Sequence, residues 1–274
     1  MNWSGAKNWL IALFAGLNIF LIIMLVGVSS NSVKLEAQVI SDTVTILKNN
    51  GIEIDESIIP EKIPKLNTVE VSNAVSDKNA FAKLLLGDKY ARENEEYIFE
   101  NKVLRFSQSK FFYTNSAPAE DYPMINEDNA AATVSGFLSG LNLSLGAAEY
   151  SVSNKNETYT VNINQKLDKY PLFDSKLTVV VSKLGIHSIE GSWFYVSNDQ
   201  SGVESSATRV TPSTGALIDF ISDSGRLSNK SNKITEITIG YTAGETADFK
   251  AYASAIPVWR IKTSDGHSYY FDAR

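Results

Sequence analysis

The chain has no cysteine and only two histidines among its 274 residues. Without cysteine it forms no disulfide, so its stability depends on packing, and an anchor built on a lipid-modified cysteine is excluded. His187 and His267 have no second histidine and no cysteine within four residues. Both are therefore predicted to be surface or packing residues, and no metal site is expected.

The motifs of several enzyme classes are missing as well. The chain has no GxGxxG or GxxxxGK[ST] loop for nucleotide phosphates and no G-x-S-x-G elbow of a serine hydrolase. Adjacent carboxylates occur at residues 95–96 and 120–121, but such neighbours are expected by chance in a chain with 31 acidic residues. They usually mark solvated loops rather than acid–base catalysts. We therefore predict no catalytic residue and no cofactor.

Positive charge is scarce and scattered. The chain has 25 basic and 31 acidic residues, which gives a formal net charge of −6 at pH 7. No run of Lys or Arg occurs that would bind a phosphate backbone or an anionic lipid surface. Nucleic acid is therefore not expected as a partner.

What the chain does have is a long apolar start. Residues 8–33 contain no charged side chain, and residues 9–28 are almost wholly apolar. Because a helix needs about 20 apolar residues to cross a hydrocarbon core of about 30 Å, we predict a transmembrane helix over residues 9–28 after a tail over residues 1–8. Lys7 precedes the span, which predicts a single-pass protein of the cell membrane with a cytoplasmic tail and an extracytoplasmic remainder.

A cleaved signal peptide is the alternative, because the small residues Gly27, Ser29 and Ser30 follow the apolar run. The apolar core of a signal peptide usually has about 7 to 15 residues, and such peptides end in an A-x-A-like site that this segment lacks. The length of the run therefore favours a retained anchor.

Three residues of the predicted span are candidates for contacts with partner helices. Ala12 and Gly16 form a small-xxx-small pair, which lets helix backbones approach closely, and Asn18 is polar in apolar surroundings. On a helix Asn18 lies about 160° from Gly16, so the two features serve different faces and fit two partners. Small residues and a single Asn also occur in plain spans, so both interpretations stay open.

Beyond the span we predict a juxtamembrane helix over residues 29–50. Apolar residues recur every three or four positions from Val33 to Leu47, and the sequence Asn49-Asn50-Gly51 supplies a stop. This helix is expected to continue from the span, either as a mechanical link or as a stalk that only sets distance.

Two α+β units with antiparallel sheets are predicted after it, over residues 51–120 and 121–274. Helices are expected over residues 77–86, 126–141 and 211–222, and strands over residues 96–99, 102–106, 111–114, 149–153, 158–165, 176–182, 189–195, 234–241 and 257–271. Helices followed by antiparallel strands indicate an α+β fold.

Both ends of the chain resemble one family. The residues that carry the resemblance are Trp3, Lys7, Ile11, Phe14 and residues 18–21 at the start, residues 170–173 in the middle, and residues 234–241, 256–261 and 269–273 at the end. They are similar to YycI, the membrane-anchored regulatory protein of the YycFG (WalRK) two-component system in Gram-positive bacteria. Val258 and Asp272 depart from the family pattern, which has Ala and Asn there, and residues 50–120 match least.

The resemblance implies a YycH/YycI-like fold and a function without catalysis. It implies regulation of an essential cell-wall sensor histidine kinase of the YycG (WalK) type. The regulator would act together with a YycH-like partner, through transmembrane and extracytoplasmic contacts.

Two other functions stay open from the residues themselves. A tethered exported enzyme, or an inhibitor of a protease or of cell-wall enzymes, would have a polar pocket with perturbed carboxylates, for instance near Glu190 or Asp219. A structural single-pass protein of the envelope would need only a stalk and an aromatic patch. The aromatic clusters at residues 111–113 and 193–195 suit such a patch or a strand core. A homo-oligomer is compatible with each function.

Overall fold

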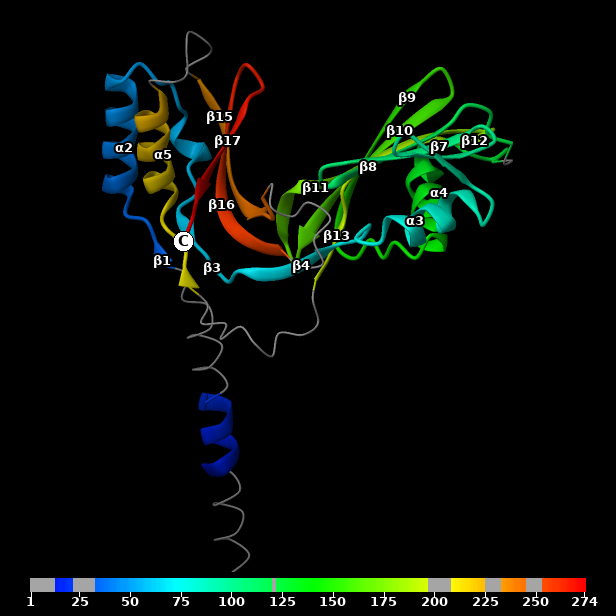
Figure 1. Ribbon diagram of the computed structural model, residues 1–274. Coiled ribbons are helices and arrows are strands. Elements are labelled where there is room, and N and C mark those ends of the chain that lie inside the picture. Colours follow the sequence, from blue (N-terminus) through cyan, green and yellow to red (C-terminus); the bar gives the residue numbers. More distant parts are fainter. Residues whose placement is uncertain (1–12, 22–32, 120–121, 197–207, 225–232, 245–252) are drawn as a thin grey trace, which may run out of the picture.

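The protein folds into two lobes that lie side by side (Figure 1). The computed structural model describes residues 13–21, 33–119, 122–196, 208–224, 233–244 and 253–274. Both lobes combine helices with mainly antiparallel strands, and one curled sheet of 13 strands runs through them. The predicted α+β class is confirmed.

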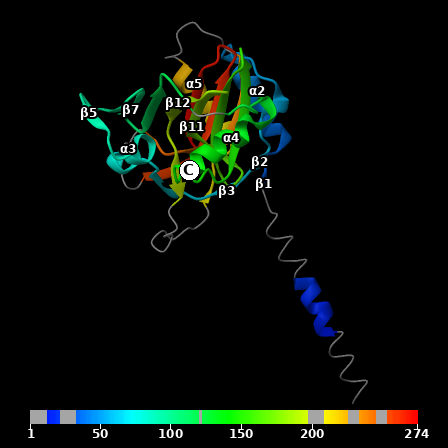
Figure 2. The ribbon, with the colours of Figure 1, turned by 90° about the vertical axis from the view of Figure 1, so that its right-hand side faces the viewer.

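The terminal lobe is built from residues 33–73 and from the described residues after 208. Its elements are β1 (Val33–Lys34), α2 (Ala37–Asn49), the 3-10 helix η1 (Glu56–Ile58), β2 (Lys62–Ile63), β3 (Lys65–Leu66), β4 (Val69–Asn73), β14 (Thr208–Arg209), α5 (Ser213–Ser224), β15 (Ile234–Thr242), β16 (Ala253–Thr263) and β17 (Ser268–Asp272). The strands β15, β16 and β17 are antiparallel neighbours, α5 packs against β16 and β17, and α2 packs beside α5 (Figures 1 and 2). Leu47, Phe220 and Trp259 are buried between these layers.

The central lobe is built from the middle of the chain. Its elements are α3 (Lys78–Leu86), β5 (Ala91–Glu93), β6 (Glu96–Phe99), β7 (Lys102–Ser107), β8 (Lys110–Asn115), α4 (Glu127–Gly140), β9 (Ala148–Lys155), β10 (Thr158–Leu167), β11 (Tyr170–Ser182), β12 (Gly185–Gly191) and β13 (Phe194–Val196). The helices α3 and α4 lie on the same side of the sheet in Figure 1, and the core there includes Phe111, Val161 and Trp193.

Two helix starts follow from single capping residues. The Asp77 side chain accepts hydrogen bonds from the N–H groups of Asn79 and Ala80 at the start of α3. At the start of α4, Asn126 and Asn129 bond to each other's backbone N–H groups in a capping box. The helices predicted over residues 77–86 and 126–141 are confirmed as α3 and α4.

The predicted juxtamembrane helix is wrong at residues 33–36. The helix α2 begins at Ala37, whereas Val33 and Lys34 form β1 and pair with β2. The reason is a competing set of backbone bonds: the Leu35 N–H donates to the Glu61 carbonyl oxygen at 2.8 Å, so this segment is tied to the lobe instead of continuing a helix. Residues 29–32 lie outside the described residues.

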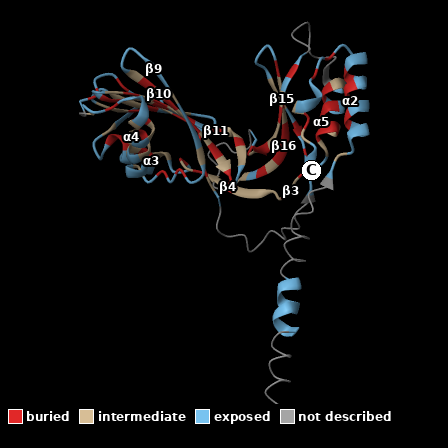
Figure 3. Ribbon diagram, turned by 180° about the vertical axis from the view of Figure 1, so that it is seen from behind, coloured by how far each residue is buried: buried red, intermediate tan, exposed pale blue. Residues whose placement is uncertain are grey.

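Buried residues gather in two cores, one in each lobe (Figure 3). The central core spans residues 75–193, whereas the terminal core joins residues 40–71 with residues 210–273 and also includes Leu167, Leu172 and Phe194 from β10, β11 and β13. The division therefore differs from the predicted boundary at residue 120. The physical reason is the pairing of β4 with β16, which brings the two ends of the chain into one sheet.

The strand β11 joins the lobes. Its second half pairs with β10 and β12 in the central lobe, whereas Leu172 pairs with Tyr241 of β15 in the terminal lobe. The register between β11 and β10 is interrupted at residues 172–175. We call residues 172–175 the connector.

Candidate functional site

Of the predicted span, residues 13–21 are described, and they are helical and exposed (Figure 3). Within the described ranges, no helix has the length and apolar character needed to span a membrane. Gly16 has open space where a Cβ would lie. The side-chain amide of Asn18 donates to the carbonyl oxygen of Phe14 at 2.8 Å. Ala12 lies outside the described residues.

The residues considered for chemistry lie apart. Glu190 is exposed on β12 in the central lobe, and Asp219 is exposed on α5 in the terminal lobe. His187 lies on β12, whereas His267 lies in the turn before β17. The described part of the chain holds no group of three side chains suited to a metal ion. The structure therefore does not bring these residues into one site.

Polar residues do come together on the face of the terminal sheet that is turned away from α5. Alternation along β15 and β16 buries Ile237, Trp259 and Ile261 in the terminal core and puts the intervening residues on the opposite face. The strand register aligns these into three rows: Glu236, Lys262 and Ser268; Thr238, Arg260 and Tyr270; and Gly240, Val258 and Asp272. We call this surface the helix-free face.

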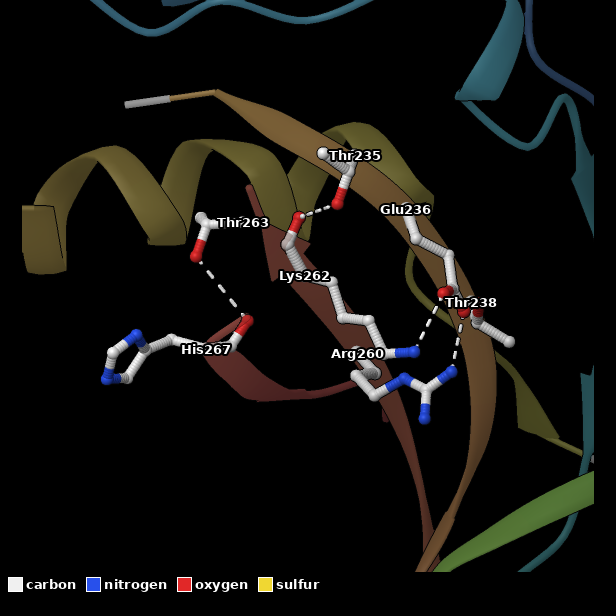
Figure 4. A network of polar contacts seen from close by, with 7 residues as sticks. All are labelled: Thr235, Glu236, Thr238, Arg260, Lys262, Thr263 and His267. Carbon is white, nitrogen blue, oxygen red and sulfur yellow. Dashed lines mark hydrogen bonds and ion pairs between the residues drawn. The ribbon is translucent and has the colours of Figure 1, made fainter. Parts of the chain in front are cut away.

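An ion network occupies the first two rows (Figure 4). Glu236 accepts a hydrogen bond from Arg260 Nη2 at 2.6 Å, lies 2.9 Å from Lys262 Nζ, and accepts from the hydroxyl of Thr238. Burial by itself would raise the pKa of Glu236, but the bonds from Thr238, Lys262 and Arg260 outweigh it and lower the pKa to about 2. The carboxylate is therefore charged throughout the neutral range.

The connector lies directly on this face. The guanidinium of Arg260 lies over the Phe173 ring, and the Phe173 and Tyr270 rings are 5.5 Å apart between centroids. A Cβ at Gly240 would lie 2.5 Å from the carbonyl oxygen of Pro171 and 2.7 Å from the Phe173 ring. Only glycine fits at residue 240 without moving β11.

The next connector residue holds the end of β15. Oδ2 of Asp174 accepts hydrogen bonds from the Thr242 hydroxyl and from the N–H groups of Ala243 and Gly244, at 2.8 to 2.9 Å. Burial raises the pKa of Asp174 although these bonds oppose the rise. Its Oδ1 is buried without a hydrogen-bond partner in the described structure. A buried carboxylate with one unsatisfied oxygen is costly, so this contact is tightly constrained.

A buried amide fixes the other side of the connector. The Gln165 side chain donates to the Phe194 carbonyl oxygen and accepts from the Phe194 N–H and from the hydroxyl of Ser175. Ser192 donates to the Asp174 carbonyl oxygen at 2.6 Å. These bonds join β10, β11 and β13 where the lobes meet, so the connector is held from both lobes.

The helix-free face carries residue types that are common in protein interfaces. Arg and aromatic residues are enriched in protein interfaces, and Tyr270 is 49% exposed. Sequence reasoning missed this surface because its polar residues look like ordinary strand alternation. The available signal was the hairpin formed by β15 and β16, which places Glu236 opposite Lys262.

The chain matches one family over most of its length. The family model described as YycI protein covers residues 30–274. The chain belongs to the YycI family. Its membership confirms the resemblance seen in the sequence and links the chain to the YycG (WalK) regulatory system. YycI proteins are regulatory and are not known as enzymes.

Two solved structures are similar to the chain at low identity. An uncharacterised protein from Eubacterium rectale is 12% identical with a TM-score of 0.46, over 76% of this chain and 82% of that one. The C-terminal domain of YpeB from Bacillus megaterium is 8% identical with a TM-score of 0.32, over 75% of this chain and 94% of that one. No curated protein matches the chain.

Proposed function

We propose that this YycI family member is a non-enzymatic, single-pass regulator that biases a sensor histidine kinase of the YycG (WalK) type. It acts in the cell membrane with its N-terminus in the cytoplasm and its two lobes outside, together with a YycH-like partner. The observation that carries the proposal is the family match over residues 30–274.

The apolar start supports the membrane part of the proposal. Six large apolar side chains within residues 13–21 are more than half exposed: Leu13, Phe14, Leu17, Ile19, Phe20 and Leu21. Leaving such a side chain in water costs roughly 1.5–3 kcal/mol relative to burial. Lipid or partner helices would remove this cost.

Regulation of the kinase requires contacts that differ between its two states. A partner shifts a kinase between two states only if it binds those states with different affinity. In the membrane, the candidates for this contact are the Ala12 and Gly16 pair and, on another face, Asn18. The bond from Asn18 to Phe14 uses one N–H of the amide, which leaves the other N–H and the oxygen for a partner helix. Outside the membrane, the candidate is the helix-free face.

Two substitutions in the full-length protein test the membrane contact. Asn18→Leu removes the polar group, and Gly16→Ile prevents close helix approach. Each should reduce co-purification of the kinase from membranes and change transcription of its target genes. Leu17→Ile is the matched control, because it keeps an apolar side chain of the same volume between the two positions.

Unchanged kinase output in both variants, at normal protein levels, would refute the membrane mechanism. The localisation of the protein distinguishes a kinase regulator from a structural envelope protein. Accumulation of the protein at the division septum, independent of the kinase, would favour a structural envelope protein instead.

A further inference from the structure

Four basic residues gather at the end of the terminal lobe where the chain enters it from the apolar start. Lys34 lies on β1, Lys62 on β2, Lys65 on β3 and Arg209 on β14, and all four are exposed. The strands β1 and β3 and the C-terminus lie together at this end (Figures 1 and 2). We call these four residues the basal patch.

The strand register sets like charges against each other twice in this patch. Lys34 lies directly opposite Lys62, and Arg209 lies directly opposite Lys65. Opposite residues of an antiparallel pair have Cβ atoms about 4.5–5.5 Å apart, so two like charges there destabilise the pair. An otherwise acidic protein therefore holds two repulsive pairs at one end.

Neighbouring acids compensate little of this charge. Lys34 lies 3.6 Å from Glu61, but both side chains are more than 60% exposed, and such pairs contribute little. Lys62, Lys65 and Arg209 form no ion pair with another described residue. Within the part of the chain that the structure describes, no ion pair therefore compensates the positive charge of these three residues.

The orientation of the patch is fixed by the core. Ile63 and Leu66 are buried in the terminal core, which turns Lys62 and Lys65 outward on the alternating backbone. The segments are also bonded to one another, since the Val210 N–H donates to the Pro64 carbonyl oxygen. Burial and backbone bonding therefore bring the charges together, although they are scattered along the sequence.

We propose that the basal patch binds the anionic headgroups of phospholipids in the membrane that holds the apolar start. This inference rests on the proposed membrane anchoring. The repulsion between the paired basic residues does not help the chain to fold. Departures of this kind from favourable folding are typical of functional sites, and here the fitting ligand carries negative charge. The contact would hold the terminal lobe against the membrane surface.

The short connection between the predicted span and β1 favours lipid headgroups over other anions as the ligand. Five residues lead from Val28, the end of the apolar run, to Val33 of β1. An extended chain spans at most about 3.5 Å per residue, so β1 stays within about 18 Å of the end of the span. A tether this short gives a high effective concentration, and each basic residue near an anionic surface strengthens the contact about fivefold.

Hydrogen exchange of the full-length protein in lipid nanodiscs tests this contact. One set of discs contains phosphatidylcholine alone, and the other contains phosphatidylcholine with phosphatidylglycerol. Amides at residues 33–35, 61–63, 65–66 and 209–211 should exchange at least about fivefold more slowly in the anionic discs. The difference should shrink at high salt, because salt screens exposed charges.

The double variant Lys62→Glu/Lys65→Glu should lose this lipid dependence. It also turns both like-charge pairs into opposite-charge pairs, so its unfolding midpoint should equal or exceed that of the wild-type chain. The matched control is Lys110→Glu/Lys155→Glu, which changes net charge equally at exposed lysines of the central lobe. The control should keep the lipid dependence.

Three outcomes would overturn the proposal. One is equal exchange in the two kinds of disc, and another is equal loss of lipid dependence in both double variants. The third is full protection by soluble polyphosphate in neutral discs, which would assign the patch to a soluble polyanion. Incorporation into discs tests the anchor separately and needs no kinase, so the patch can fail while the proposed function stands.

Discussion

The guanidinium carbon of Arg260 lies 4.4 Å from the centroid of the Phe173 ring, so a side chain of the terminal sheet holds a residue of the connector. The same guanidinium donates to Glu236 at 2.6 Å. Arg260 therefore couples the ion network of the helix-free face to the strand that continues into the central lobe.

Replacing Arg260 with Ala should lower the free energy of unfolding by about 2–5 kcal/mol. A hydrogen bond to a charged group contributes about 1.5–3 kcal/mol, and a partly buried cation–π contact contributes about 0.5–2 kcal/mol. Urea denaturation followed by fluorescence measures the change.

The control is Arg105→Ala, whose ion pair with Glu96 is longer, at 3.6 Å, and more exposed. That variant should lose less than about 1 kcal/mol. Equal losses in the two variants would contradict the coupling.

Glu236 should make stability depend on pH in the acid range. Its pKa in the folded protein is about 2, below its ordinary value of 4.5, so its stabilising effect is complete above pH 4.5 and is lost as pH falls toward 2. Glu236→Gln should therefore show a flatter fall in unfolding midpoint over this window. Because the side chain is 40% exposed, solvent screening reduces the expected difference to about 1 kcal/mol.

Asp174 should make stability depend on pH in the opposite direction to Glu236. Burial raises its pKa, so the folded protein binds this proton more tightly than the unfolded chain does. The stability of the wild-type chain relative to Asp174→Asn should then rise as pH falls through the raised pKa. If both variants changed the pH profile in the same direction, the two assignments could not both be right.

Local features of the fold could be predicted from the sequence because they depend on neighbouring residues. Asp77 and Asn126 cap their helices through bonds to N–H groups two or three residues away, and the strand over residues 96–99 has the predicted bounds. The turn between β6 and β7 follows from Glu100 and Asn101 for the same reason.

Features that depend on distant pairing could not be predicted. The missed first half of β11 is stabilised by Arg260 and the end of β15, about 70 to 90 residues further along the chain. The predicted strand over residues 189–195 is broken between β12 and β13, where Ser192 bonds to Asp174. The basal patch is scattered in the sequence and appears only when β1 pairs with β2 and β3 with β14.

The contact between β11 and β15 should be sensitive to a single methyl group. Gly240→Ala places a Cβ against the Pro171 carbonyl oxygen and the Phe173 ring, so β11 must shift and the free energy of unfolding should fall by about 1–3 kcal/mol. The matched control is Gly136→Ala in α4, where a Cβ meets no atom within 4 Å.

The control should instead stabilise the protein by about 0.5–1 kcal/mol, because alanine is favoured over glycine inside a helix. Thermal unfolding compares the two variants directly, and hydrogen exchange at residues 172–175 shows where the structure loosens. Faster exchange confined to the connector and β15 would mean that this contact sets the position of the lobes. A Gly240→Ala protein as stable as the control, with unchanged exchange there, would mean that the lobes are joined mainly through the buried bonds of Gln165.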